Sequence, residues 1–134
     1  MSRIVLDSGA IIGVERGNSR MIKLLARAAE NDWALIVPSA VIAETWRGAK
    51  TDASIARFLK TINAFTPLDR EAGMRIGSLL ASADLRSGAH VVDASVVDAA
   101  VQSAPCLIAT SDATDIRRLL KAALPSQQIE IFAI

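Results

Sequence analysis

The segment HVVDASVVDAA, residues 90–100, places an acidic residue at the head of an apolar helical face. If this segment is a helix, one stripe along it consists of Asp93, Val96, Val97, Ala100, Val101 and Ala104. A lone buried carboxylate is costly unless it is hydrogen-bonded, paired with a cation or bound to a metal. No Lys or Arg is close to Asp93 in the sequence. We therefore expect other polar groups to meet Asp93 in space.

Short apolar runs on both sides of this segment predict strands. They cover residues 4–6, 34–37 and 107–109, with a short extended piece at 64–66 and a final strand at 129–134 after Pro125. Their apolar character throughout is typical of buried parallel strands. Because helical patterns alternate with them, the sequence predicts one domain, residues 1–134, with an α/β/α sandwich around a central, mainly parallel sheet.

Helices are expected between these strands, with start and stop signals at several ends. They cover residues 10–15, 19–31, 40–47, 69–83 and 113–123, with a further helical stripe at Ile55, Phe58, Leu59 and Ile62. Ser19, Ser39 and Asp69 are the expected N-caps, and Gly48 is the expected terminator of the third helix. Residues 84–88 are expected to form a polar loop.

Composition excludes several classes of protein. Hydrophobic residues make up 51% and charged residues 22% of the 134 residues, which is ordinary for a globular domain. A net charge of +1 indicates neither a nucleic-acid binder nor an acidic scaffold. One Cys and one His cannot form a disulfide or a multi-cysteine zinc site, and Cys106 is expected in a buried strand. No uncharged apolar run has the length of a signal peptide or membrane span, so we expect a soluble, cytoplasmic protein.

Acidic residues recur where the predicted strands end. Asp7 follows the first strand, Asp112 follows the strand at 107–109, and Glu44 lies one turn into a helix. Ligands of open parallel sheets bind outside the carboxyl ends of the strands, where these acids and Asp93 would converge. An all-oxygen ligand set suits Mg²⁺ or Mn²⁺ and disfavours zinc. The chemistry this suggests is metal-assisted hydrolysis of a phosphodiester bond.

Each of these acids also has a simpler interpretation. Asp7, Asp93 and Asp112 could be ordinary N-caps, and Glu44 could lie on a solvated edge. Asp115, in the first turn of the last helix, is explained by the helix dipole and is kept as a possible further ligand. Convergence of the four acids at one end of the sheet is what favours the metal site.

Other polar residues near the acids are assigned weaker roles. Ser8, Thr110 and Ser111 could orient a water molecule, the substrate or Asp112, although capping explains Thr110 and Ser111 as easily. Asp98 groups with Ser95 and Gln102 on a polar helix side, which favours a solvated role. His90 is expected to be a loop histidine without a catalytic role, and Trp46 to pack in a core or interface.

Two basic helical clusters could contact a phosphate backbone. They are Arg20, Lys23 and Arg27, and Arg117, Arg118 and Lys121. Solvated helix faces explain both clusters equally well.

Four segments together resemble the acidic motifs of PIN domains in order and spacing. They are IVLDSGAII, VIAETWRG, VVDASVVDAA and LIATSDATDIRRL, and the similarity extends from Ile4 to Ile134. The chain is similar in size to the VapC toxins of bacterial toxin–antitoxin pairs. The resemblance implies that Asp7, Glu44, Asp93 and Asp112 hold the metal, with Asp115 as an additional acid.

The resemblance also implies an activity and partners. VapC toxins are Mg²⁺-dependent endoribonucleases, usually dimeric, and a small VapB antitoxin blocks their active site. We therefore expect an RNA substrate, a VapB-like antitoxin, a homodimer, and Mg²⁺ or Mn²⁺ as cofactor. Where the family often has Ser or Thr two positions after the first Asp, this chain has Gly9, with Ser8 as the neighbouring hydroxyl.

Two other classes remain open at this stage. A catalytically inactive PIN-like module would bind RNA or a protein without cutting. A phosphotransfer receiver domain also gathers acids at strand ends, but it usually needs a Lys after its last strand, and residues 129–134 contain none. The receiver is therefore the weakest of the three.

Overall fold

A single sheet of five parallel strands lies at the centre of the protein. The computed structural model describes residues 2–85, 88–123 and 128–134. The strands are β1 (Arg3–Leu6), β2 (Ala34–Pro38), β3 (Ala64–Thr66), β4 (Cys106–Thr110) and β5 (Ile129–Ala133). Their order across the sheet is β3-β2-β1-β4-β5, and every neighbouring pair is parallel. The expected parallel sheet is confirmed.

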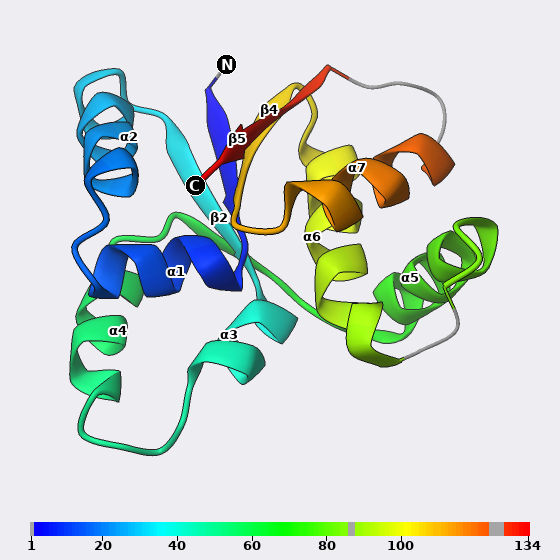
Figure 1. Cartoon of the computed structure of the whole chain (residues 1–134), viewed down its shortest axis with the longest axis horizontal. Helices are drawn as coiled ribbons and strands as arrows, with labels where there is room; N and C mark the ends of the chain where they lie inside the picture. Colours follow the sequence, from blue (N-terminus) through cyan, green and yellow to red (C-terminus); the bar gives the residue numbers. More distant parts are fainter. Residues whose placement is uncertain (1, 86–87, 124–127) are drawn as a thin grey trace.

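Helices cover both faces of this sheet. They are α1 (Ser8–Glu15), α2 (Ser19–Glu30), α3 (Ser39–Thr45), α4 (Asp52–Leu59), α5 (Arg70–Ser82), α6 (Val91–Ser103) and α7 (Ala113–Ala122), with the short 3₁₀ helix η1 (Gly88–His90) leading into α6. Figure 1 shows α1 and α2 on one side of the sheet and α6 and α7 on the other. The α/β/α sandwich expected from the sequence is therefore present.

The core is centred on β1 and α6. Ile4, Val5 and Leu6 are fully buried in the central strand, and Cys106 is fully buried in β4 as expected. Helix α6 contacts the sheet and also packs against α5 and α7. It is therefore buried on more than one side, and the expectation that Ser95 lies on a polar side is wrong. Ser95 is 5% exposed and donates its hydroxyl hydrogen to the Val92 carbonyl at 2.6 Å.

Two of the expected N-caps are wrong by one residue. Asn18, rather than Ser19, caps α2 by accepting a hydrogen bond from the Met21 amide at 3.0 Å. Ser39 is the first residue of α3, and Pro38 occupies the cap position without a side-chain bond. The Asp69 cap on α5 is confirmed, because its carboxylate accepts from the Ala72 amide at 2.9 Å.

Helix α3 ends earlier than the expected residue 47. Trp46 already has an extended backbone, at φ −77° and ψ 128°. The carboxylate of Asp52 accepts hydrogen bonds from the amides of Arg47 and Ala49, at 3.1 and 2.9 Å. These bonds hold the chain in a turn after α3, so Gly48 lies in this loop instead of terminating the helix.

The remaining boundaries agree with the expectations to within a few residues. Residues 86 and 87 of the expected loop 84–88, and Pro125 before the last strand, lie outside the described residues. Among the helices that the structure describes, none combines the length and the apolar character needed to cross a membrane.

Candidate metal centre

The order in which the chain adds strands to the sheet reverses direction at β1, in the centre of the sheet. From β1 the chain proceeds outward to β2 and β3, and then returns to β4 on the other side of β1. A crevice outside the carboxyl ends of two such strands is the usual ligand site of an open α/β sheet. Asp7 directly follows β1 and Asp112 lies two residues after β4, so both acids are at this position.

Asp7 has two structural partners. It is 5% exposed, and its Oδ1 accepts a hydrogen bond from the Ala10 amide at 2.9 Å, which caps α1. Its Oδ2 accepts a bond from the hydroxyl of Thr110. Burial raises the pKa of Asp7 above its usual value, the hydrogen bonds from Thr110 and the α1 amides oppose the shift, and the charge of Asp112 adds to it. The capping interpretation of Asp7 is therefore correct, and the same carboxylate also lies near Asp112.

Thr110 connects the ends of the two central strands. Its side chain is fully buried at the end of β4. The hydroxyl donates to Asp7 and accepts a hydrogen bond from the Asp112 amide at 2.9 Å. One hydroxyl group thus fixes the carboxylate of Asp7 relative to the backbone of Asp112.

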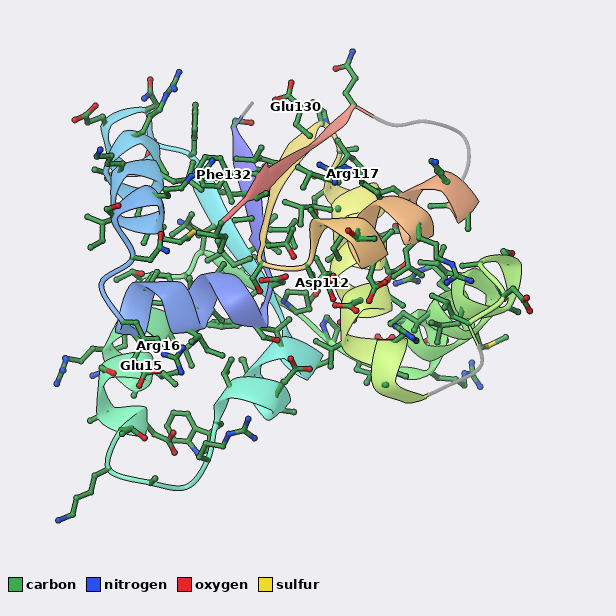
Figure 2. All side chains as sticks on the ribbon, viewed as in Figure 1. Glu15, Arg16, Asp112, Arg117, Glu130 and Phe132 are labelled. Carbon is green, nitrogen blue, oxygen red and sulfur yellow. The ribbon has the colours of Figure 1, made fainter. Side chains whose placement is uncertain are left out.

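Asp112 does not act as a helix cap. It occupies the N-cap position of α7, but its side chain makes no capping hydrogen bond among the described residues. Figure 2 shows Asp112 in the turn between β4 and α7, in the middle of the molecule. Its backbone amide is held by Thr110, so its position is fixed while its exposed carboxylate is not used by the helix.

Asp93 lies where the charges of the other acids act together. Its side chain is 20% exposed, in the first turn of α6. Its pKa is raised to about 6, first by burial and then by the negative charges of Asp112, Asp115, Asp7 and Glu44. The four acids named in the sequence analysis, and Asp115, therefore lie close enough in the structure for their charges to interact. Repulsion among such carboxylates is relieved when a cation binds between them.

The other expected residues occupy the edges of this cluster. Glu44 is exposed on α3, which packs against α6, and Ser8 is 7% exposed at the start of α1. Ser111 is exposed and lies against Gly9 in the turn after β4.

His90, expected to be a loop histidine without a catalytic role, lies beside two of the acids. It lies in η1, and its Nδ1 atom is 3.9 Å from one carboxylate oxygen of Asp93 and 3.9 Å from one of Asp115. The spacing of three residues between His90 and Asp93 places both on one helical face, and this was the signal available in the sequence.

Asp98 is neither a member of the cluster nor simply solvated. It accepts two hydrogen bonds from the guanidinium of Arg75, at 2.9 and 3.1 Å, and its side chain is 12% exposed. This ion pair joins α6 to α5.

Three arginines of the two basic clusters make contacts within the chain. Arg20 stacks on Phe132, which Figure 2 shows between β5 and α2, at 5.0 Å, and Arg27 stacks on Trp33 at 5.7 Å. Arg118 donates to the Ala83 carbonyl at 3.1 Å. Trp46, expected to pack in a core or an interface, is 44% exposed beside the end of α3 and so is not part of the core.

The donor set of the cluster fits a divalent cation. Carboxylate oxygens predominate, and burial together with the charges of four neighbouring acids raises the pKa of Asp93 to about 6. Among the described residues, His90, Asp93 and Asp115 present ligand atoms within 4.8 Å of one another. These donors suit magnesium or manganese and include no cysteine.

No protein-family model matches the chain, and no curated protein sequence does. Solved structures with the same fold do exist. One of them is a structure of VapBC2 from Rickettsia felis bound to a DNA fragment from the VapBC2 promoter. A chain of it superposes on this protein with a TM-score of 0.68 at 15% identity, and the match covers 97% of this chain and 98% of that chain.

Two further structures are similar over the same extent. A chain of FitAB bound to an IR36 DNA fragment has a TM-score of 0.66 at 16% identity, covering 97% of this chain and 94% of the other. A chain of DNA-bound VapBC from Salmonella typhimurium has a TM-score of 0.66 at 15% identity, with 98% of each chain covered. At this level of identity the comparison establishes architecture alone. Over nearly its whole length the chain has the PIN-like fold, as its four acidic motifs predicted.

Proposed function

We propose that this protein is a metal-dependent endoribonuclease, acting as the toxin of a VapBC-type toxin–antitoxin pair. The observation that carries the proposal is the convergence of Asp7, Glu44, Asp112 and Asp115 on Asp93, whose pKa their charges and its burial raise to about 6. Carboxylates held this close repel one another, and a bound cation would offset that repulsion.

The chain's own residues would hold and orient the reacting groups. Asp7, Asp93 and Asp112 are the proposed ligands, with Glu44 at the rim either as a ligand or as the group that activates water. An ion bound there would lower the pKa of a water molecule. It would also offset the negative charge that develops on the phosphodiester during hydrolysis. Thr110 holds Asp7 and the backbone of Asp112 in a fixed relation, so the ligands need little reorganisation.

The toxin–antitoxin role rests on two independent similarities. The acidic motifs resemble those of VapC toxins, and the fold is shared with structures of VapBC and FitAB. Those structures contain DNA, whereas we propose RNA as the substrate of this chain. A VapB-like antitoxin and a homodimer belong to the same proposal.

The decisive experiment incubates purified protein with total RNA in the presence of Mg²⁺, Mn²⁺ or EDTA. We expect cleavage with either ion, none with EDTA, and none with Asp7→Asn. Asp98→Asn is the matched control, because Asp98 lies on α6 like Asp93 but pairs with Arg75. It should cleave at the wild-type rate. Cleavage that survives EDTA or the Asp7→Asn change would refute the assignment.

The inactive PIN-like module is tested by the same preparation. Calorimetric titration with Mn²⁺ should show binding to the wild type that Asp7→Asn loses. A chain that binds RNA but neither binds Mn²⁺ nor cuts would be such a module.

A further inference from the structure

His90 presents a buried nitrogen without a hydrogen-bond partner. Its Nδ1 atom is inaccessible to solvent and makes no hydrogen bond among the described residues, although the whole side chain is 26% exposed. Buried polar atoms are almost always satisfied, so an unpaired one calls for a specific explanation. Two carboxylates, those of Asp93 and Asp115, lie close to this atom.

The surroundings of Nδ1 have the dimensions of a coordination site. One oxygen of Asp93 and one of Asp115 are each 3.9 Å from Nδ1, and the three ligand atoms lie within 4.8 Å of one another. Ligand atoms around a single divalent ion are separated by roughly 3 to 4 Å, given metal–ligand distances near 2.1 Å. A small movement of the three side chains would bring all three to one ion.

These three residues are held by different elements that pack together. His90 ends η1, Asp93 lies one turn later in α6, and Asp115 lies in the first turn of α7. Helices α6 and α7 contact each other, as do α6 and η1. The packing of these elements therefore brings the three residues close together.

We propose that His90 is a metal ligand through Nδ1, and that with Asp93 and Asp115 it makes the candidate metal centre prefer Mn²⁺ to Mg²⁺. This inference rests on the proposed function, since Asp93 is shared with the acids described above. Imidazole is a good ligand for first-row transition metals, whereas Mg²⁺ is usually bound by oxygen alone. The imidazole nitrogen therefore favours Mn²⁺ over Mg²⁺, a preference that a site built of carboxylates alone would lack.

The test uses electron spin-echo modulation of Mn²⁺ bound to the full chain, expressed without a histidine tag. The chain contains one histidine, so any imidazole ¹⁴N modulation must arise from His90. We expect this modulation in the wild type and in Asp98→Asn, and its loss in His90→Gln. Calorimetry should show Mn²⁺ affinity lowered at least about tenfold in His90→Gln, with Mg²⁺ affinity nearly unchanged.

The outcomes separate this inference from the proposed function. Tight Mn²⁺ binding without ¹⁴N modulation would overturn the role of His90 and leave the acidic centre standing. Failure of the wild type to bind Mn²⁺ would overturn both. If His90→Gln does not fold, as judged by circular dichroism, the wild-type spectrum alone decides, because no second histidine can produce the signal.

Discussion

Ser111 occupies the space that a side chain at Gly9 would need. A Cβ atom built on Gly9 would lie 2.6 Å from the Cβ of Ser111, 3.2 Å from its backbone nitrogen and closer still to its Oγ. The start of α1 and the turn after β4 can approach this closely only because residue 9 is glycine. The hydroxyl of Ser111 therefore lies where a side chain at position 9 would begin.

Gly9→Ala should therefore destabilise the protein and displace the turn that bears Asp112. We expect a loss of about 1–3 kcal/mol in the free energy of unfolding, measured by urea denaturation, together with weaker Mn²⁺ binding. Ser111→Gly in the same chain should restore most of the stability. Gly73→Ala is the control: it lies in α5 with no atom near a new Cβ, and should be neutral or slightly stabilising. Equal stability of Gly9→Ala and wild type would contradict the contact.

Thr110→Val should cost about 1–3 kcal/mol, because it keeps the shape of the side chain but leaves the Asp112 amide and an oxygen of Asp7 without their partner. Thr110→Ser keeps the hydroxyl and should retain most of the stability and the Mn²⁺ affinity. Thermal unfolding and calorimetric titration of the two variants measure these effects. If Val and Ser behave alike, the hydroxyl does not position the two acids.

Much of the fold followed from the sequence because its signals are local. Mostly apolar runs of three to six residues marked the strands, and the Asp69 cap marked the start of α5. The boundaries that were wrong depended on contacts between distant residues. Helix α3 ends at Thr45 because the carboxylate of Asp52 accepts hydrogen bonds from the amides of Arg47 and Ala49. The sequence of the helix itself contains no signal for this end.

The acids of the candidate site, and Thr110 as a group that orients Asp112, could be named from the sequence, whereas the bond between Thr110 and Asp7 and the position of His90 could not. Asp7 and Asp112 could be located because each follows a strand, and parallel strands bring their ends to one edge. The bond from Thr110 to Asp7 joins residues 103 positions apart, and its existence depends on β1 and β4 being neighbours. His90 was dismissed because its relation to Asp115 arises only when α6 and α7 pack together.

Asp7→Asn should separate the structural role of this residue from its proposed metal role. The amide oxygen of Asn can still accept from Ala10 and cap α1, and its amide nitrogen can donate to the Thr110 hydroxyl, which donates to Asp7 in the wild type, so the melting temperature should fall only modestly. Mn²⁺ affinity should fall steeply, because the charge is gone. Asp7→Ala should in addition lose about 1 kcal/mol through the missing cap. Unfolding curves and Mn²⁺ titrations on both variants give the comparison, and full Mn²⁺ affinity in Asp7→Asn would exclude it as a ligand.

Without metal, the protein should become less stable as pH rises from about 4 to about 6. The pKa of Asp93 is about 6 in the folded chain against a usual value of 3.8, so within this interval the folded state holds a proton that the unfolded state has lost. The free energy of unfolding then falls with pH, by up to about 3 kcal/mol from this residue. Urea denaturation in EDTA across this range measures the slope, and Asp93→Asn should reduce it.

Added Mn²⁺ should reverse this trend, because the ion competes with the proton for the same carboxylate. Below a pH of about 6 Asp93 is mostly protonated and binds the ion weakly, so added metal stabilises little. Above a pH of about 6 the carboxylate is ionised and binds Mn²⁺ at full strength. The increase in the free energy of unfolding then grows with the ratio of the free Mn²⁺ concentration to the dissociation constant. Melting temperatures with Mn²⁺ and with EDTA should therefore diverge as pH rises through about 6. Asp98→Asn should diverge in the same way, whereas Asp93→Asn should show a smaller divergence, carried by the remaining ligands. Parallel curves for the wild type would mean that Asp93 does not hold the ion.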